Sequence, residues 1–257
     1  MMNKPKKTGT GKVATSPPAD AVPSANRNGE RTRVQILDAA ETLFSEHGLD
    51  GVSMRDIAVS AEVTLALVNY HFGSKDKLYR MVFERRIVPV SASRRAALAL
   101  VLDRKSPAPV IREVLDALAR PWVEMRLHPG GLAYSRLIAR EVGDPAEGKR
   151  GIVSDLLDPI ALEFMDAMQQ VMPKMAAGRV AWAYHFFIGA LLLILSNPDR
   201  VTRLSGKVCD VGDEQAVIDE IVNLFARAFE GPDAPARKKP STSTTKSRKP
   251  ETGKKKA

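Results

Sequence analysis

Two short helical segments joined by a tight turn, within residues 53–72, constrain the fold of this chain more than any other part of its sequence. The first segment starts with Ser53-Met54-Arg55-Asp56, which has the form of a capping box. In that motif the Ser53 hydroxyl accepts a hydrogen bond from a backbone N–H at the helix start, while the Asp56 carboxylate reaches back to the cap. The pattern therefore predicts a short helix that begins near Met54.

The second segment follows a turn at Glu62-Val63. Thr64 has a hydroxyl that suits the N-cap of a helix of about eight residues. Three-and-four spacing predicts that the buried stripe of this helix is Leu65, Val68 and Phe72. The positions left nearer the outside are Ala66, Leu67, Asn69, Tyr70 and His71. Two short helices with such a turn form a helix-turn-helix unit, whose second helix reads DNA.

Helices are predicted on both sides of this unit. The upstream helix, Arg33 to His47, ends before Gly48, where a left-handed residue is expected. Its apolar residues at helical spacing are Ile36, Leu37, Ala40, Leu43 and Phe44. Downstream, Ser74 is predicted to cap a helix whose inward face carries Leu78, Val82 and Phe83. That helix must run out of the small domain, so we expect it to connect to a second one.

The order and spacing of residues between Arg33 and Leu78 match a known family pattern. The matching residues are Ile36-Leu37-Asp38-Ala39-Ala40, Leu43-Phe44, Ser53, Ile57-Ala58, Ala61, Val63, Tyr70-His71-Phe72, Lys75 and Leu78. Through them the chain resembles the TetR family of transcription regulators. Glu62 departs from the family, where a glycine is usual in the turn, and Asn69 stands where a tyrosine is common. A positive φ at Glu62 would cost about 1 kcal/mol, which the packed domain tolerates.

The resemblance implies that one surface of this region faces DNA. Its residues would be Ser53, Arg55, Thr64, Leu65, Leu67, Asn69, Tyr70, His71 and Lys75. Phosphate oxygens suit the donors among them, namely Ser53, Thr64, Tyr70, His71 and Lys75, and such contacts set register without reading sequence. An exposed asparagine can pair with both N6 and N7 of adenine, so Asn69, together with Arg55, is predicted to read bases.

Two of these assignments have alternatives that the sequence leaves open. Leu65, Ala66 and Leu67 would either meet thymine methyl groups or be buried against the neighbouring helix. His71 would either contact phosphate or pack as a neutral side chain beside Phe72.

The formal net charge of +9 comes from the two ends of the chain. Residues 1–28 carry a net charge of +4 and residues 231–257 carry +7, so the region between them is slightly acidic. Both ends are rich in Lys, Pro, Ser and Thr, which predicts disordered basic tails. Such tails either strengthen DNA binding without sequence choice or are merely solvated extensions. The prediction of DNA binding therefore depends on the motif.

The region between the tails has room for two all-α domains. We expect an N-terminal three-helix, helix-turn-helix DNA-binding domain at 29–90, followed by a larger helical domain for effector binding and dimerisation at 91–230. Apolar periodicity and breaks at Pro and Gly predict further helices at 110–122, 132–142 and 152–171. Pro121 is expected to bend the first of them, and Pro159 to kink or restart the last.

Ala176 to Ser196 is the longest apolar region. The sixteen largely hydrophobic positions from Val180 to Leu195 fall short of the roughly twenty that a membrane span needs, which predicts a buried helix and no membrane partner. A helix that is apolar all round needs more than one neighbour, and a second subunit would supply the cover. An amphipathic helix at 217–229 would lie beside it. The resemblance implies that both helices from each chain form a four-helix homodimer interface.

A homodimer would place two heads about one turn of DNA, roughly 34 Å, apart on a palindrome. In TetR-like proteins a ligand in the larger domain shifts the connector helix, so the resemblance implies a repressor that its ligand releases from DNA. A looser resemblance, to a fatty-acid-responsive subgroup, rests on residues 68–72, 140–145 and 182–189 and suggests a small apolar or acyl effector. The predicted pocket residues are Trp122, Met125, Arg136, Arg140, Phe164, Met168, Trp182 and Phe186, with Arg136 or Arg140 as carboxylate partner.

Other functional classes find less support. The histidines (His47, His71, His128 and His185) lack metal-binding spacing, and no nucleophile motif or glycine-rich phosphate loop occurs, so no enzyme, metal or cofactor is predicted. The single Cys209 fits a reducing cytoplasm. Two alternatives remain, namely a nonspecific DNA-binding protein driven by its tails and a helical small-molecule-binding protein without DNA function.

Overall fold

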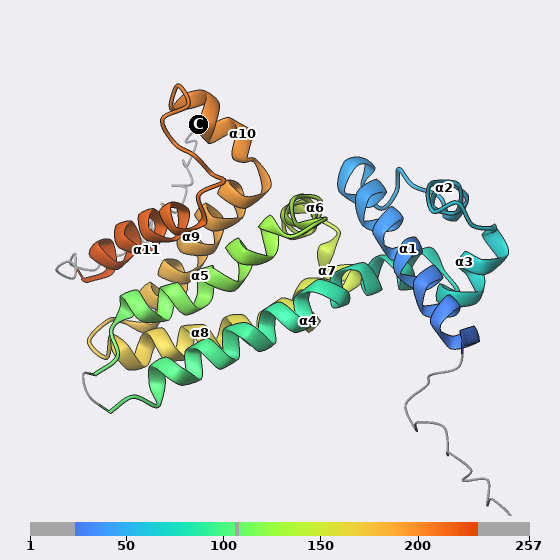
Figure 1. The fold of residues 1–257 in the computed structure, drawn as a ribbon. Coiled ribbons are helices and arrows are strands. Elements are labelled where there is room, and N and C mark those ends of the chain that lie inside the picture. The colour runs from blue at the N-terminus through green and yellow to red at the C-terminus, as the bar shows by residue number, and fades with distance from the viewer. Residues whose placement is uncertain (1–23, 106–107, 231–257) are drawn as a thin grey trace, which may run out of the picture.

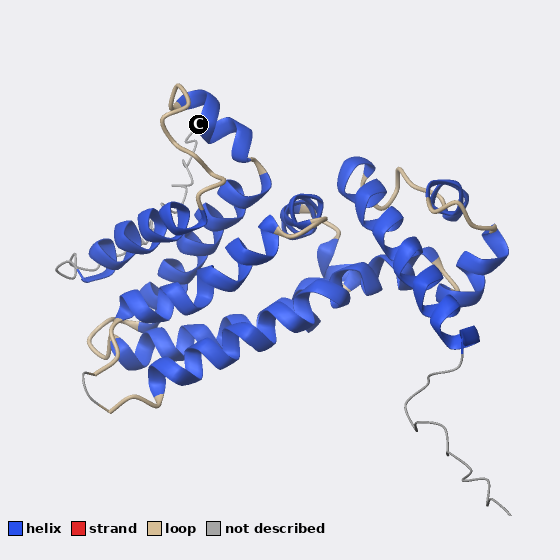
Figure 2. Ribbon diagram, viewed as in Figure 1, coloured by secondary structure: helices blue, strands red, loops and turns tan. Residues whose placement is uncertain are grey.

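The structure, a computed structural model, describes residues 24–105 and 108–230, and within these ranges it is helical and contains no strand (Figures 1 and 2). A small head is formed by α1 (Ser24–His47), α2 (Met54–Ser60) and α3 (Leu65–Phe72). The long helix α4 (Lys75–Leu102) leaves the head and runs along the larger domain. The prediction of an all-α chain with an N-terminal helix-turn-helix is confirmed.

The larger domain packs around α5. Its elements are α5 (Ile111–Leu127), α6 (Gly131–Gly143), α7 (Glu147–Arg150), the π-helical segment η1 (Val153–Leu157), α8 (Asp158–Val171), α9 (Ala177–Ser196), α10 (Pro198–Leu204) and α11 (Glu214–Glu230). Helix α5 packs against α4, α11 and α8, while α6 contacts α9 on one side and α1 of the head on the other. Buried apolar side chains from both domains form one continuous core.

Several elements differ from the expected boundaries. Helix α1 starts at Ser24, so residues 24–28, which we predicted as tail, are helical, and the helix starts well before Arg33. Pro159 restarts the chain as α8 after the π-helical turn, in agreement with one of the two expected outcomes. The short helices α7 and α10 were not predicted, because four and seven residues are too few for an apolar periodicity to appear. The predicted tails otherwise lie outside the described residues.

Helix α4 joins the two domains without a break. The predicted domain boundary at residue 90 falls inside it. Pro89 also lies inside this helix, and since proline has no N–H, it cannot donate to the Arg85 carbonyl. Beyond Pro89, the buried face of α4 carries Val90, Arg94 and Leu98. The connector therefore has one missing backbone hydrogen bond just before it enters the larger domain.

A buried ionic cluster ties the head to the larger domain. The Glu41 carboxylate of α1 is 2% exposed. It accepts from Nη2 of Arg85 at 2.7 Å, and from Nε and Nη2 of Arg86 at 2.9 and 2.6 Å. Arg86 Nη2 also donates to the Pro129 carbonyl at 3.0 Å, just before α6. Three elements, α1, α4 and the turn before α6, therefore meet at one carboxylate.

A second buried cluster joins α4 to α6. The Tyr79 hydroxyl donates to Glu141 at 2.9 Å, and Arg150 Nε donates to the same carboxylate at 2.9 Å. Burial, followed by the charge of Glu141, raises the pKa of Tyr79, so the phenol remains protonated and donates. Glu141 is itself 1% exposed, and both of its carboxylate oxygens accept hydrogen bonds.

Candidate nucleic-acid interface and ligand cavity

The capping box predicted at the start of α2 is confirmed. The Ser53 hydroxyl accepts from the Asp56 N–H at 3.1 Å, and the Asp56 carboxylate accepts from the Ser53 N–H at 2.8 Å. The Ser53 hydroxyl also donates to Asp56 at 2.7 Å, and these hydrogen bonds lower the pKa of the Asp56 carboxyl. The direction and start of α2 are therefore fixed by its own first turn.

The turn between α2 and α3 is held from both sides. Gln35 of α1 donates from Nε2 to the Ala61 carbonyl at 2.8 Å, and the Val63 N–H donates to Ala58 at 3.0 Å. Thr64 caps α3, since its hydroxyl accepts from the Leu67 N–H at 3.3 Å. Glu62 has a φ of 52°, the left-handed conformation in which glycine is usual.

Replacing Glu62 by glycine is expected to stabilise the protein. Relief of the left-handed strain, of the order of 1 kcal/mol, exceeds the stabilisation that the added entropy of glycine gives to the unfolded chain. The difference should raise the melting temperature by roughly 2 °C. The control is Glu124→Gly, at an exposed position inside α5, which should lose about 1 kcal/mol. Thermal unfolding followed by circular dichroism measures both. Equal destabilisation by the two changes would contradict strain at Glu62.

Helix α3 is anchored by two of the three residues predicted for its buried stripe. Val68 and Phe72 are buried, and the Arg33 guanidinium of α1 lies 5.0 Å from the centre of the Phe72 ring. The prediction that Leu65 is buried is wrong, because this side chain is 41% exposed and Leu67 is 40% exposed. This helix of eight residues contacts α2 and α4, and these contacts bury only the stripe of Val68 and Phe72.

The residues predicted to face DNA belong to the start of α2, to α3 with its N-cap, and to the start of α4. The exposed ones are Ser53, Arg55, Thr64, Leu65, Leu67, Asn69 and Tyr70. The side chains of Arg55 and Asn69 make no hydrogen bond to any residue in the described ranges, so their polar groups are available. His71 and Lys75 are half-buried. The His71 ring lies 5.3 Å from that of Tyr70, and Lys75 Nζ donates to the Leu49 carbonyl at 3.0 Å.

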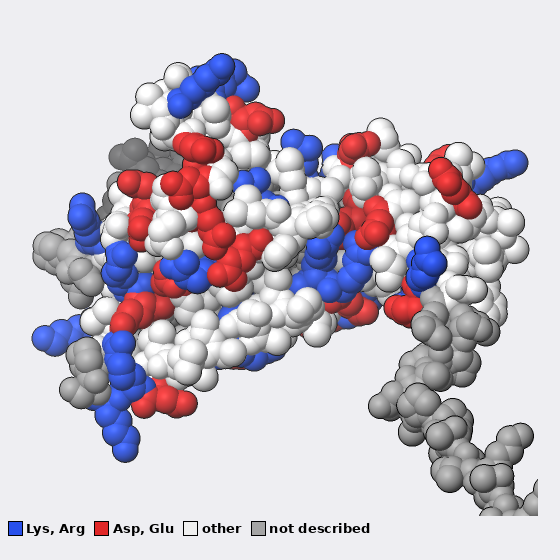
Figure 3. Space-filling model, viewed as in Figure 1, with Lys and Arg blue, Asp and Glu red and all other residues white. Residues whose placement is uncertain are grey.

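The distribution of charged side chains on one face of the molecule can be followed in Figure 3. On the face drawn in Figure 3, Lys and Arg side chains are scattered among Asp and Glu over both domains and do not form a basic band over α2 and α3. This agrees with a net positive charge that comes from the ends of the chain.

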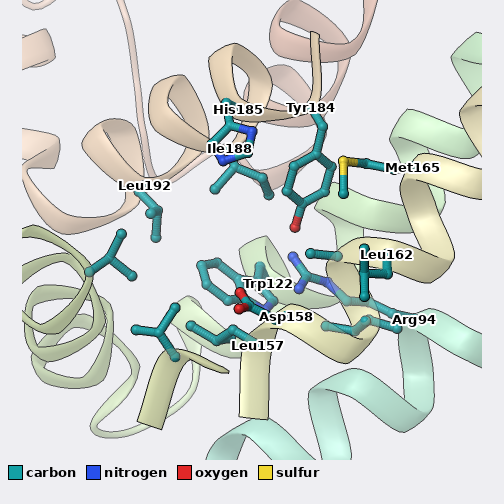
Figure 4. Close-up of a pocket in the computed structure, with 14 residues that line it drawn as sticks. Arg94, Trp122, Leu157, Asp158, Leu162, Met165, Tyr184, His185, Ile188 and Leu192 are labelled. Atoms are coloured by element: carbon teal, nitrogen blue, oxygen red, sulfur yellow. The ribbon is translucent and has the colours of Figure 1, made fainter. Parts of the chain in front are cut away.

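A cavity of about 380 Å³ lies in the larger domain between α4, α5, α8 and α9 (Figure 4). Of the eight predicted pocket residues, only Trp122 lines it. Phe164 and Met168 are fully buried in the core instead, and Met125 lines a separate hollow beside Arg86. Apolar helical stripes fill cores as well as pockets, and here they mostly fill the core.

The other four predicted pocket residues lie on the surface. Arg136 donates to the Ser196 carbonyl at 3.4 Å, and Arg140 donates to the Glu46 backbone carbonyl of α1 at 3.2 Å. Trp182 and Phe186 are 65% and 59% exposed, with their rings stacked 5.5 Å apart on the outer face of α9. The structure thus does not bring these four residues to the cavity.

No prediction from the sequence included the arginine of this cavity. Arg94 lines it and is 2% exposed. A signal was present, because Val90, Arg94 and Leu98 follow at four-residue spacing, which places an arginine on the apolar face of the connector.

Helix α9 carries an uncovered apolar face. Trp182, Phe186 and Leu193 are each more than half exposed, and a Cβ added at Gly189 would meet nothing. These residues follow at four-, three- and four-residue spacing and so form one stripe. The expectation that α9 is buried on nearly every side is not met within one chain. By length and composition alone, α9 is also able to span a membrane, a property that it shares with core helices of soluble proteins.

Comparisons with known proteins match both parts of the chain. The family model for bacterial regulatory proteins of the tetR family matches residues 36–82, and the model for the tetracyclin repressor-like C-terminal domain matches residues 116–228. The HTH-type transcriptional repressor NicS of Pseudomonas putida is 26% identical over 213 residues, which cover 80% of this chain and 94% of that protein. The HTH-type transcriptional repressor KstR2 of Rhodococcus jostii is 33% identical over 92 residues, 36% of this chain and 43% of that protein.

Solved structures share the fold along most of the chain. The fatty acid degradation regulator FadR from Bacillus halodurans has a TM-score of 0.57 at 15% identity, covering 78% of this chain and 97% of that one. The TetR family regulator PfmR from Thermus thermophilus has a TM-score of 0.54 at 18% identity, covering 76% and 95%. Helix order, the capped reading head and both family models agree, and the chain belongs to the TetR family of DNA-binding transcriptional regulators.

Proposed function

We propose that this protein is a repressor that binds a palindromic operator as a homodimer and is released by a ligand of its larger domain. The observation that carries the proposal is the outer surface of α3, where Asn69 and, from α2, Arg55 present free polar groups on a rigidly capped head. An α-helix fits the major groove, where each base pair shows a distinct pattern of donors and acceptors. On this proposal the protein represses transcription in the cytoplasm and catalyses no reaction, as is expected from its similarity to transcriptional repressors.

The residues on this surface divide into two roles. Asn69 and Arg55 read base edges, while the exposed Leu65 and Leu67 are available to meet thymine methyl groups. The phosphate contacts come from Ser53, Thr64, Tyr70, His71 and Lys75. The hydroxyls of Ser53 and Thr64 also cap helices, so their contacts to phosphate keep the two helix starts against the DNA backbone.

Two copies are needed because one short helix reads only part of a site. The stripe of α9 formed by Trp182, Phe186, Gly189 and Leu193 is apolar and exposed in the single chain, and Leu224 of the adjacent α11 is 67% exposed. Covering this stripe with the same stripe of a second copy buries both and sets the two heads at a fixed separation. The four-helix interface is thus built from α9 and α11 of each chain.

The proposed release from DNA on ligand binding depends on α4, because this helix contacts both the head and the cavity. Helix α4 starts next to the reading helix and lines the cavity at Arg94, so a ligand that favours one position of α4 changes head separation. Linkage then requires that ligand and operator weaken each other's binding.

The roles assigned to Asn69 and Lys75 predict different outcomes. The operator is first isolated as the genomic fragments that the purified protein retains. Asn69→Ala is then expected to reduce discrimination between operator and single-base variants by about 5- to 100-fold, because one bidentate contact is lost. Lys75→Ala should weaken all duplexes similarly and lower the salt slope by about one. Fluorescence anisotropy at two salt concentrations measures both, and the opposite pattern would overturn the assignment.

The same titration separates the proposal from the tail-driven alternative. Protein lacking residues 1–23 and 231–257 is compared with the full chain on operator and random duplexes. We expect the truncated protein to lose affinity for both duplexes but to keep its preference for the operator. Loss of the preference would favour nonspecific binding by the tails.

A further inference from the structure

Arg94 lies in the interior of the larger domain with an incomplete set of partners. Its Nε donates to the Leu118 carbonyl of α5 at 2.8 Å. Its Nη2 is buried without any hydrogen bond, and no hydrogen bond joins Nη1 to a residue of the described ranges. A buried charged donor left unpaired is unfavourable. Binding of an acceptor at this guanidinium therefore removes an existing penalty.

The Arg94 side chain is positioned and remains charged. Its Cζ lies 4.4 Å from the centre of the Trp122 ring, a cation–π contact that holds the guanidinium over an aromatic face. Burial lowers the pKa of Arg94 to about 10, which is still above neutral pH. In Figure 4 the Tyr184 hydroxyl points towards the guanidinium from α9. One end of the cavity thus offers a fixed positive charge and a hydroxyl.

The rest of the cavity is mostly apolar. Its walls include Leu157, Leu162, Met165, Ile188 and Leu192. His185 also lines it, with Nδ1 already 2.8 Å from the Ala181 carbonyl. If each non-hydrogen atom takes about the volume of a water molecule, roughly 30 Å³, the 380 Å³ holds about a dozen such atoms. The cavity therefore suits a small apolar body.

One carboxylate, that of Asp158, also lines the cavity. It stands in the first turn of α8, where a helix N-terminus favours negative charge, and the residue is exposed. No hydrogen bond or ion pair joins Asp158 to Arg94. The Asp158 carboxylate repels the negative group of a ligand from its own side of the cavity. This repulsion favours pairing of that group with Arg94.

We propose that this cavity binds a small amphipathic carboxylate, whose head group pairs with Arg94 and whose apolar body lies between α8 and α9. The inference rests on the ligand-controlled release proposed above, and it assigns the head group to Arg94 in place of Arg136 or Arg140. Since Arg94 stands on α4, the carboxylate acts directly on the helix that carries the reading head.

Calorimetric titration of the full-length protein with matched acids and alcohols tests this pairing. The probes are decanoate with decan-1-ol, and 4-phenylbutyrate with 4-phenylbutan-1-ol. We expect at least one acid to bind tenfold or more tightly than its alcohol, because a charged hydrogen-bonded pair forms in a buried site. Arg94→Met should lose this preference and still bind the alcohol. Equal binding of every acid and its alcohol by the wild type, or an unchanged preference in Arg94→Met, would overturn the proposal.

Two further variants and a control keep the test decisive. Ile188→Trp fills the cavity and keeps Arg94, so this variant should bind neither acid nor alcohol. Tight binding by Ile188→Trp would show that the ligand binds outside this cavity and would overturn the proposal. Asp158→Asn removes the repelling charge and should increase the affinity for the acid without changing that for the alcohol. Arg95→Met, at a half-exposed arginine of α4 that pairs with Glu163, is the control and should keep both affinities. If Arg94→Met does not fold, Ile188→Trp and Asp158→Asn decide. Operator affinity without ligand is measured on the same proteins. A wild type that binds the acids but does not bind the operator would contradict the proposed function and leave the carboxylate site standing.

Discussion

Changing Trp182 and Phe186 together to glutamate is expected to convert the protein to a monomer and to weaken operator binding at least a hundredfold. Both side chains are more than half exposed and stack on each other on the outer face of α9. Four glutamates would face one another in the proposed interface, where burying unpaired charge is prohibitive. Without the second head, the operator loses the effective-concentration gain of a linked site, which is about 10²- to 10⁴-fold.

Light scattering after size exclusion gives the mass, and fluorescence anisotropy with a full operator gives the affinity. Val88→Glu with Leu100→Glu is the matched control, because it also adds two charges at exposed apolar positions, both on α4, which packs mainly against α5 and α1. The control should stay dimeric and bind the operator normally. A Trp182/Phe186 variant that remains dimeric, or a monomer that binds like wild type, would contradict the interface.

Glu41→Ala is expected to lower the melting temperature by roughly 6–12 °C. The change leaves two arginines, whose side chains are 21% and 19% exposed, without their shared buried carboxylate. Breaking a buried ion pair from one side costs about 3–5 kcal/mol, and partial exposure of the arginines places this case near the lower end. For a protein of this size, 1 kcal/mol corresponds to about 2–4 °C.

Glu163→Ala is the control for Glu41→Ala. Arg95 donates to both oxygens of Glu163, but the two side chains are 48% and 43% exposed. A pair in that setting contributes about 0–1 kcal/mol, so its loss should shift the melting temperature by less than about 4 °C. Differential scanning calorimetry compares the variants, and similar shifts for both would mean that Glu41 is not the tie between head and larger domain.

The reading head was the part of the fold most open to prediction from sequence. The N-caps at Ser53, Thr64 and Ser74 all occur as expected, because each depends on a contact within three residues of the cap. Glu62 has a left-handed backbone at the position where the family pattern usually has a glycine. N-caps and turns depend on residues that are close in sequence, so they can be predicted without a tertiary structure.

Long-range contacts account for what the sequence did not show. Glu41 pairs with Arg86, 45 residues away, and no periodicity marks such a pair. An almost wholly apolar α9 gives no indication of which face turns inward, so Trp182 and Phe186 were assigned to a pocket although they point out. The roles of the exposed residues on α2 and α3 stay predictions, since exposure permits DNA contact and does not demonstrate it.

Pro89 leaves α4 without one backbone hydrogen bond at a position between the head and the cavity. The segment from Lys75 to Pro89 is a rigid arm of about 21 Å, at 1.5 Å per residue. In the proposed dimer, a tilt of roughly 5° at Pro89 would displace the Lys75 end of the arm by about 2 Å, in opposite senses in the two symmetric copies. The proposed ligand release would then use α4 as a lever, in which a movement at Arg94 too small to disturb the packed core is enlarged at the distant end.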